Sequence, residues 1–401
     1  MKVLIADVLP AECVEKIRKL GMEVVYNPDL GASDLPKAIK GINVLVVRST
    51  EVPAAVVQAS DALALVIRAG SGVNTIDTEA CSKAGIFVSN CPGLNSVAVA
   101  ELAMAHILSL DRNIPDCVAD LRAGKWNKGK YSKQGNGLKG RTLGLIGFGN
   151  IGQEVAKRAL AFEMRVVAYD PAMTKSAIER KGVEAVDSMA DICSLSNVIS
   201  IHVPFNKNTK GLIGTAEFAR MQKGTFIINT SRGGVIDEAA FLQAAAEKGV
   251  RGGFDVFSDE PAEKSGAYTS AMAQSPAVYG THHIGASTVQ AQIAVAEEVV
   301  ELLKLFNEGG HVRHCVNLET ASRAKAVLVI RHYDRVGVLA EIFRILKAEN
   351  VNVENMENYI LKGQETACAR IRVSKPLTSI TKLTADPALK DVIIHAEMFA
   401  L

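Results

Sequence analysis

Three short stretches of the sequence carry side chains that could act together on a small substrate. They are SRGG with Arg232, DEP with Glu260, and THHIGAST with the adjacent histidines His282 and His283. An arginine fork matches a carboxylate or a reacting oxygen. An imidazole can accept a hydroxyl proton near neutral pH, and a carboxylate beside it fixes its tautomer. Together these residue types suit proton transfer on a small substrate that carries a carboxylate.

Each of these residues also has a simpler interpretation. Arg232 could form a structural salt bridge, and Glu260 could be a solvated residue before Pro261. Neighbouring side chains of an extended chain point to opposite faces, so we expect only one of His282 and His283 to face a cleft. The residues alone leave open which one.

A glycine-rich turn indicates the cofactor. GFGNIG places Gly147, Gly149 and Gly152 between a predicted strand and a predicted helix, with Asp170 at the end of the next strand. The glycines permit a tight turn, a close approach to a pyrophosphate, and close packing of helix on sheet. The free N–H groups of the helix N-terminus would hold the phosphates. Asp170 can accept hydrogen bonds from ribose hydroxyls and would repel a 2′-phosphate, which predicts NAD rather than NADP. The alternative is a glycine turn without a ligand.

Two series of alternating strands and helices must position these residues. Apolar runs at 2–7, 43–49, 63–70 and 85–90 predict one parallel sheet, and runs at 141–147, 164–170, 197–204, 225–230 and 252–257 predict a second. A helical pattern at 95–122 contains Pro115, which should interrupt it. An amphipathic helix at about 287–308 is expected to return to the first domain. The order βαββαβ from residue 324 onward is ferredoxin-like.

The predicted fold class is therefore α/β, with two doubly wound parallel-sheet (Rossmann-like) domains and a C-terminal ferredoxin-like βαββαβ domain. We expect residues 1–96 and 287–310 to form a discontinuous substrate-binding domain and residues 97–286 to form the NAD-binding domain. Residues 311–323 would be a linker, and residues 324–401 a small regulatory domain.

Composition narrows the function classes. The chain has 401 residues, a formal net charge of +2 and a hydrophobic content of 48%, so nothing in its overall charge favours nucleic acid or an anionic membrane. No apolar run is long enough to span a bilayer, and the first residues lack signal-peptide character. The seven cysteines are odd in number and form no CxxC pair, which favours reduced thiols in the cytoplasm. No metal site is predicted.

The chain resembles the D-isomer-specific 2-hydroxyacid dehydrogenases over nearly all of residues 1–310. The resemblance rests on motifs in a fixed order: RAGSGVNTID (68–77), NSVAVAEL (95–102), the glycine turn, NTSRGGVIDE (229–238), DVFSDEP (255–261) and THHIGAST (281–288). It implies that Arg232, Glu260 and His283 form the catalytic set. Alignment on HIGAST selects His283, and His282 stands where the family has proline, so the simplest interpretation of His282 is a packing or surface residue.

The resemblance also implies contacts to NAD. Asn150 and Ile151 would lie at the pyrophosphate, and the Asp255 carboxylate would meet the nicotinamide carboxamide, since a carboxylate at a buried strand end needs a partner. The adenosine side and the remaining nicotinamide contacts would come from His202, Val203, Pro204, Thr230, Ser231, Gly285 and Ala286.

Within the family, two segments are similar to those of phosphoglycerate dehydrogenases. VVRST contains Arg48 and Ser49, which would hold a substrate phosphate, and Lys128 follows Trp126 in a lysine-rich loop whose basic residue would reach a partner subunit's site. Ser71 and Gly72 could offer backbone N–H groups to a carboxylate. The implied reaction is NAD-dependent oxidation of 3-phospho-D-glycerate to 3-phosphooxypyruvate, the first step of phosphorylated L-serine biosynthesis, in a homodimer or homotetramer. The lysines could equally be a solvated loop.

The C-terminal segment resembles an ACT domain, in which serine binds between paired domains. His332 and Asp334 match positions that would touch such an effector. The domain could instead serve assembly only, and His332 could be a surface residue at a strand end. Two other functions remain open. One is a glyoxylate or hydroxypyruvate reductase, and the other is a dinucleotide-sensing corepressor that binds NAD without turnover.

Overall fold

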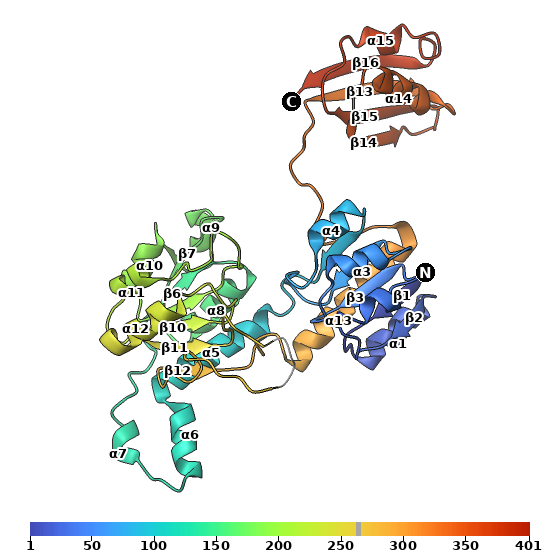
Figure 1. The fold of residues 1–401 in the computed structure, drawn as a ribbon. Coiled ribbons are helices and arrows are strands. Elements are labelled where there is room, and N and C mark those ends of the chain that lie inside the picture. The colour runs from blue at the N-terminus through green and yellow to red at the C-terminus, as the bar shows by residue number, and fades with distance from the viewer. Residues whose placement is uncertain (262–265) are drawn as a thin grey trace. The chain divides into compact units, whose positions relative to one another are not determined.

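Three β-sheets organise the chain in the computed structural model, which describes residues 1–261 and 266–401. The contacts divide it into two compact units, Met1–Asn317 and Leu318–Leu401 (Figure 1). Two parallel sheets lie in the first unit and one antiparallel sheet in the second. This arrangement confirms the predicted fold class. The division of the first unit into a substrate-binding and an NAD-binding domain stays a prediction.

The first sheet has the strand order β2-β1-β3-β4-β5, and all its strands are parallel. Its central strand β3 reads VLVV and is wholly buried, as expected when helices cover both faces of a parallel sheet. The edge strand β2 is largely exposed, and the sequence analysis missed it because it lacks a buried apolar run. The elements are β1 (Lys2–Ile5), α1 (Ala11–Lys19), β2 (Glu23–Tyr26), α2 (Leu35–Ala38), β3 (Val44–Val47), α3 (Ala54–Ala59), β4 (Leu65–Arg68), α4 (Thr78–Lys83) and β5 (Phe87–Asn90).

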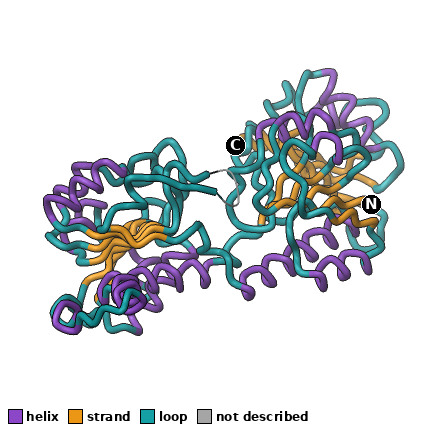
Figure 2. The backbone as a smooth tube through the Cα atoms, turned by 60° about the horizontal axis from the view of Figure 1, so that its bottom comes forward, coloured by secondary structure: helices purple, strands orange, loops and turns teal. Residues whose placement is uncertain are grey.

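The second sheet has the order β12-β11-β10-β9-β6-β7-β8 and is also parallel. The strand order reverses between β6 and β9, which is where doubly wound sheets bind ligands. Figure 2 shows helices on both faces of the strands. The elements are β6 (Thr142–Ile146), α8 (Asn150–Ala161), β7 (Arg165–Tyr169), α9 (Lys175–Glu179), β8 (Glu184–Ala185), α10 (Met189–Leu195), β9 (Val198–Ile201), α11 (Thr215–Arg220), β10 (Phe226–Asn229), α12 (Glu238–Lys248), β11 (Arg251–Phe254) and β12 (Val278–Gly280).

Two long helices connect the parts of the first unit. α5 (Ser96–Arg112) packs on α8 and on β10 and β11 of the second sheet. It ends at Asn113, which has left-handed backbone, and α6 (Ile114–Arg122) begins there with Pro115 in its first turn. The predicted interruption is therefore present, but Asn113 makes the break and Pro115 only starts the next helix. A short helix, α7 (Lys128–Tyr131), follows in the predicted lysine-rich loop.

The helix α13 (Val289–Gly309) packs against α1. Its buried residues, such as Val295 and Val299, share one core with Val3 and Ile5 of β1. The chain then runs along β5, where Cys315 pairs with Ser89 and the Asn317 side chain accepts a hydrogen bond from Val88 N–H. The predicted linker 311–323 therefore includes residues that hydrogen-bond to the first sheet.

The second unit is an antiparallel sheet in the order β14-β15-β13-β16. Its elements are β13 (Ala326–Tyr333), α14 (Val338–Ala348), β14 (Val353–Ile360), β15 (Thr366–Val373), α15 (Thr381–Thr384) and β16 (Ile393–Ala400). Apolar residues three and four apart on α14, including Val338, Ile342 and Ile345, pack on Leu328 and Ile371 of the sheet. The hairpin turn between β14 and β15 contains Gly363 with a positive φ of 101°, a conformation that glycine adopts without steric cost.

None of the helices among the described residues has the length and apolar character needed to cross a bilayer.

Candidate active site

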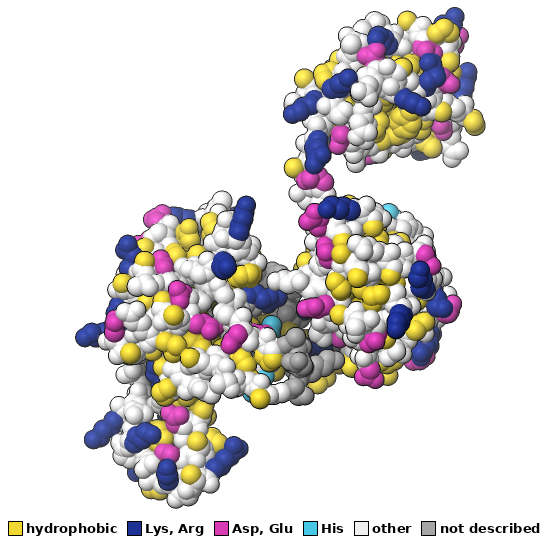
Figure 3. All heavy atoms as spheres, in the orientation of Figure 1, with side chains coloured by type: hydrophobic (Ala, Val, Ile, Leu, Met, Phe, Trp, Pro, Cys, Tyr) yellow, Lys and Arg dark blue, Asp and Glu magenta, His cyan; other side chains and the backbone are white. Residues whose placement is uncertain are grey.

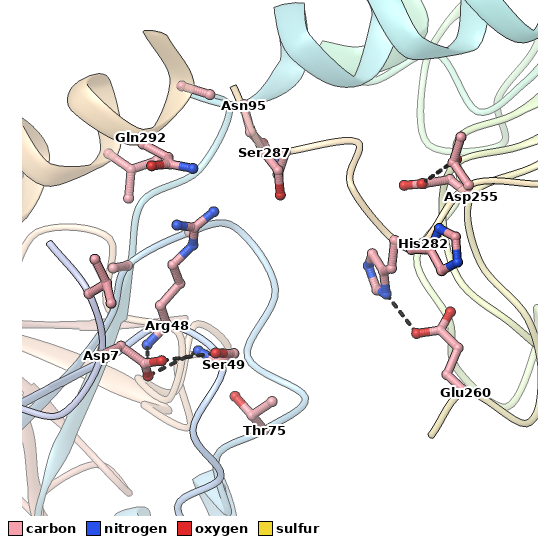
Figure 4. Close-up of a pocket in the computed structure, with 18 of the residues that line it drawn as sticks. Asp7, Arg48, Ser49, Thr75, Asn95, Asp255, Glu260, His282, Ser287 and Gln292 are labelled. Atoms are coloured by element: carbon pink, nitrogen blue, oxygen red, sulfur yellow. Dashed lines mark hydrogen bonds and ion pairs between the residues drawn. The ribbon is translucent and has the colours of Figure 1, made fainter. Parts of the chain in front are cut away.

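A cavity of about 910 Å³ lies in the first unit at the carboxyl ends of strands from both parallel sheets. Asp7, Arg48 and Arg68 reach it from the first sheet, and Asp255 and His283 reach it from the second. Figure 4 shows Asp7 and Arg48 on one side of the cavity and Asp255 and Glu260 on the other, with Gln292 of α13 above Arg48. This is the edge at which parallel α/β sheets place their ligands.

Two of the residues expected to do chemistry form a hydrogen-bonded pair. His283 Nδ1 lies 2.7 Å from Glu260 Oε2, and the Phe257 N–H donates to the other carboxylate oxygen at 2.9 Å. Burial raises the pKa of Glu260, but the hydrogen bonds from His283 and Phe257 outweigh burial and leave that pKa below its usual value. An ionised Glu260 accepts a hydrogen bond from His283 Nδ1–H. Nε2 is therefore the ring nitrogen that can receive a proton.

Both histidines of THHIGAST border the cavity. The expectation that only one could do so is wrong, because the chain is not extended at this point. His283 has left-handed backbone, with φ of 52°, and its N–H donates to the Asp255 carbonyl at 2.9 Å. This turn breaks the alternation of side chains that the expectation assumed. Of these two histidines, only His283 hydrogen-bonds to a carboxylate within the described residues.

Arg232 follows strand β10 in a loop that Asn229 holds. The Asn229 amide donates to the Arg232 carbonyl at 2.9 Å and accepts from the Ser231 N–H at 3.0 Å. The Arg232 guanidinium reaches the other half of the unit and lies against Gly72, where an added Cβ would be 2.5 Å from Nη2. Burial lowers the pKa of Arg232, and the charge of Glu260 opposes that effect.

Arg68 is a cavity residue that the sequence analysis missed. It ends β4, and its pKa falls to about 10 because it is buried and because Arg232 and Arg48 lie near it. Its Nε is buried without a hydrogen-bond partner in the described structure. The guanidinium crosses the space above Gly70, where a Cβ would be 1.6 Å from Nη1. The position of an arginine at a strand end before AGSG was the available signal.

Asp7 is a second residue that the sequence analysis missed. It follows β1, is 4% exposed, and accepts hydrogen bonds from the N–H groups of Arg48, Ser49 and Thr50 at 2.7, 3.1 and 3.0 Å. Burial raises the pKa of Asp7, but these hydrogen bonds dominate and the pKa lies below its usual value. Asp7 therefore fixes the loop that carries Arg48 (Figure 4).

The other residues predicted to bind the substrate differ in their contacts and in their position relative to the cavity. The Ser49 hydroxyl donates to Asp7 at 2.9 Å, and the Ser71 hydroxyl donates to Asn95 at 2.9 Å, so both hydroxyl protons are engaged within the protein. Gly72 lies beside the Arg232 guanidinium. Lys128 lies on α7 and is not among the residues that line the cavity.

The glycine turn has the shape that a dinucleotide needs. Gly147 has φ of 91°, and a Cβ there would lie 2.7 Å from the His202 carbonyl. A Cβ on Gly152 would lie 2.4 Å from the Gly147 carbonyl, whereas Gly149 faces open space. Asp170 accepts the Phe148 and Ala172 N–H groups at 2.8 and 2.9 Å, which hold its carboxylate beside the turn. Asn150 and Ile151 form the first residues of α8, whose N-terminus opens at the turn.

Further predicted cofactor residues surround this turn. The His202 ring pairs with the Ser200 hydroxyl at 2.9 Å, and burial lowers the pKa of His202 to about 3. His202 Nδ1 and Thr230 Oγ1 are buried without partners in the described part of the chain, which fits a ligand that would satisfy them. Val203 and Pro204 follow β9, and Ser231 follows β10.

Asp255 is 1% exposed and already has partners. Its carboxylate accepts the Thr281 hydroxyl at 2.6 Å and the N–H groups of Ile284 and Gly285 at 2.8 and 2.7 Å. The expected partner was a carboxamide of NAD, and the structure adds this second role of holding the loop around His283. Ala286 continues the loop and lines the cavity.

In the second unit, His332 and Asp334 differ in exposure. His332 is 1% exposed, and its ring pairs with the Tyr333 carbonyl at 2.9 Å and with the Asn358 side chain at 3.3 Å. It is therefore not the strand-end surface residue considered above. Asp334 lies at the surface.

The glycine turn at the switch point and the histidine–glutamate pair facing arginines define a dinucleotide-binding α/β protein with an acid–base site. Residues 104–285 match the family model described as D-isomer specific 2-hydroxyacid dehydrogenase, NAD binding domain. A hydroxypyruvate reductase from Thermotoga maritima is 40% identical over 311 residues, which cover 98% of that protein. The chain belongs to the D-isomer-specific 2-hydroxyacid dehydrogenase family.

Two further comparisons concern phosphoglycerate enzymes. A D-3-phosphoglycerate dehydrogenase from Methanocaldococcus jannaschii is 38% identical over 327 residues, or 81% of this chain. The chain spans about three fifths of the length of that relative, since 61% of it is covered. The NAD⁺-bound 3-phosphoglycerate dehydrogenase of Entamoeba histolytica superposes with a TM-score of 0.66 at 28% identity, covering 79% of this chain and 99% of that one. These matches and the family model confirm NAD as the predicted cofactor.

Proposed function

We propose that the protein oxidises 3-phospho-D-glycerate to 3-phosphooxypyruvate with NAD, the first step of phosphorylated L-serine biosynthesis. The observation that carries the proposal is a group of three neighbouring arginines. Arg48 and Arg68 line the cavity, and Arg232 lies close enough to Arg68 to lower its pKa. Within residues 1–261 and 266–401, none of them forms an ion pair with a carboxylate. Three half-buried arginines, none of them ion-paired within the described residues, suit a substrate that carries both a carboxylate and a phosphate.

Each of these residues has a separate role in the proposed reaction. Arg232 holds the substrate carboxylate and orients C2. His283 Nε2 accepts the C2 hydroxyl proton as the carbonyl forms, and Glu260 stabilises the resulting imidazolium through Nδ1. NAD bound at the glycine turn would supply the acceptor for the hydride that leaves C2. Arg48 and Arg68 bind the phosphate at the other end of the substrate.

A hydroxypyruvate or glyoxylate reductase is the second candidate. The Thermotoga maritima relative, which the chain covers almost completely, favours it, and so does the position of Lys128 away from the cavity. Such an enzyme would have no use for Arg68, because its substrate has no phosphate. A corepressor that only senses the dinucleotide is a third, less favoured possibility and would show no turnover.

One steady-state comparison tests these candidates. We expect kcat/KM to be highest for 3-phosphooxypyruvate reduction and 3-phosphoglycerate oxidation, and lower for hydroxypyruvate and glyoxylate. Arg68→Gln should raise KM for 3-phosphoglycerate at least tenfold, since a charge-assisted hydrogen bond contributes about 1.5–3 kcal/mol, and should leave hydroxypyruvate turnover unchanged. A preference for hydroxypyruvate that Arg68→Gln does not alter would favour the reductase.

We infer that the active form is a homodimer or homotetramer, assembled through the α6–α7 segment. No residue of α6 is buried, and the segment exposes Ile114, Val118, Leu121 and Trp126. Figure 3 shows apolar and basic side chains together on this part of the surface. A partner would cover the apolar residues and would bring Lys128 toward a neighbouring site. Light scattering of wild type and Leu121→Glu tests this, with a monomer expected for the variant.

Serine as an effector and a cytoplasmic location belong to the same proposal. The ACT resemblance and the exposed Asp334 support the effector, and titration of the activity with L-serine tests it. All seven cysteines are free thiols, which supports a reducing compartment such as the cytoplasm, and fractionation of cells tests that.

A further inference from the structure

A buried histidine outside the catalytic set lies behind the loop that carries His283. His106 is on α5, is 4% exposed, and its Nε2 lies 3.2 Å from Thr281 Oγ1. The Thr281 hydroxyl donates its only proton to Asp255 Oδ1 at 2.6 Å. Its lone pair must therefore accept from the ring, so His106 carries a proton on Nε2. The two hydrogen bonds therefore form a chain in which His106 donates to Thr281 and Thr281 donates to Asp255.

Asp255 holds the His283 loop from two sides. Its carbonyl accepts the His283 N–H at 2.9 Å, and its carboxylate accepts the N–H groups of Ile284 and Gly285. An added Cβ on Gly285 would lie 3.0 Å from Oδ2, so the close approach depends on glycine. Any change in the orientation of the Asp255 carboxylate therefore changes the backbone that orients the His283 ring.

Strand β11 leaves space for the His106 ring. A Cβ on Gly253 would lie 2.6 Å from the His106 Cβ and 2.9 Å from its Cγ. Glycine within a strand weakens the strand and marks close approach of another group, and here that group is His106. Burial lowers the pKa of His106 against the opposing charge of Asp255, so the ring stays neutral and keeps a single N–H to donate.

We propose that His106 is a positioning residue that acts through Thr281 and Asp255 to fix the His283 loop for proton transfer. This inference rests on the proposed role of His283 in the reaction. His106 does not line the cavity, so it acts on the reaction only through this chain of hydrogen bonds. Because α5 also begins at the cavity beside Asn95, the histidine ties the loop to that helix.

The test compares variants that remove the donor with one that keeps it. His106→Leu removes the N–H at similar volume, Thr281→Val removes the hydroxyl, and His106→Gln keeps an N–H in reach. We expect kcat to fall about tenfold in His106→Leu, the effect of one lost hydrogen bond, and to recover most of the loss in His106→Gln. Thr281→Val should lower kcat at least as much, because it removes both hydrogen bonds of the hydroxyl. The double variant should lose no more than Thr281→Val alone, because both substitutions break the same chain.

Two further measurements separate positioning from general destabilisation. The Kd for NADH should change less than twofold, and amide exchange in the peptide 281–288 should be faster in His106→Leu. Ile107→Val is the matched control, because Ile107 is fully buried on the same helix and touches none of these hydrogen bonds. It should lower stability and leave kcat and exchange at 281–288 as in wild type.

The outcomes distinguish this inference from the proposed function. If wild type turns over none of the hydroxy acids, both are overturned. If wild type is active and His283→Ala is not, but His106→Leu keeps full kcat, only the role of His106 is overturned. Losses in His106→Leu and Thr281→Val that multiply in the double variant would also overturn it.

Discussion

The residue pair at the cavity gives the sharpest expectation for single substitutions. His283 pairs with Glu260, while His282 borders the cavity and pairs with no carboxylate among the described residues. We expect His283→Ala to lower kcat by at least 100-fold, the usual contribution of a general base, and to leave NADH binding unchanged. His282→Ala should change kcat by less than a factor of three, as for a residue without a charged partner. Steady-state kinetics decides, and a more damaging His282→Ala would show that the wrong histidine was assigned.

The charge of the Asp7 carboxylate should contribute to the stability of the protein, because it holds the loop that carries Arg48. Because its folded pKa lies below the unfolded value of about 3.9, its stabilising effect is complete above that value and disappears as the pH falls through the folded pKa. Urea unfolding of wild type should therefore show a greater loss of stability between pH 5 and pH 3 than Asp7→Asn does. Equal losses in the two proteins would mean that the hydrogen bonds to Arg48, Ser49 and Thr50 contribute nothing through the charge.

Residue types predicted the glycine turn and a histidine–carboxylate pair, because their chemistry is visible in the local sequence, and the family resemblance selected Glu260 and His283. The sequence analysis missed Asp7 because nothing local distinguishes it from any polar residue at a strand end, and it missed Arg68 although the AGSG that follows was a local signal. Their role comes from what β1, β3 and β4 bring together, and from contacts such as Asp7 with Arg48 that join positions far apart in the chain.

At the scale of elements, buried apolar runs predicted the long central strands within a few residues. The strands that escaped are β2, β8 and β12. β2 is largely exposed, and β8 and β12 have two and three residues, too few for a periodic pattern. The break between α5 and α6 was predicted at Pro115 and occurs at Asn113, because proline fits the first turn of a helix better than its interior.

Strand β11 allows a test of how tightly an element depends on its glycine. We expect Gly253→Ala to destabilise the protein by about 1–3 kcal/mol, as overpacking does, because the new Cβ meets the His106 Cβ. Gly129→Ala on α7 is the matched control, since no atom lies within 4 Å of its Cβ position, and should be neutral or slightly stabilising. Thermal unfolding of both variants checks this, and equal melting temperatures would contradict the packing argument.

At the scale of the whole molecule, the two units have separate cores. The core of the second unit contains no residue before Ala326, and the first unit includes Asn317, whose amide donates to the Ile86 carbonyl at 2.9 Å. We expect residues 1–317 to fold alone and to keep the wild-type kcat, as self-contained domains do. Any sensitivity to serine should be lost. Circular dichroism and kinetics of the shortened chain check this, and an unfolded product would show that the units depend on each other.

The left-handed backbone at position 283 restricts which residue types can occupy that position, separately from the need for an imidazole. Residues branched at Cβ are outliers in that conformation, whereas glycine and asparagine adopt it readily. A pool of genes randomised at codon 283 and sorted only for resistance to protease should therefore become rich in glycine and asparagine and poor in valine and isoleucine. The histidine itself would return to dominance only when growth depends on the chemistry.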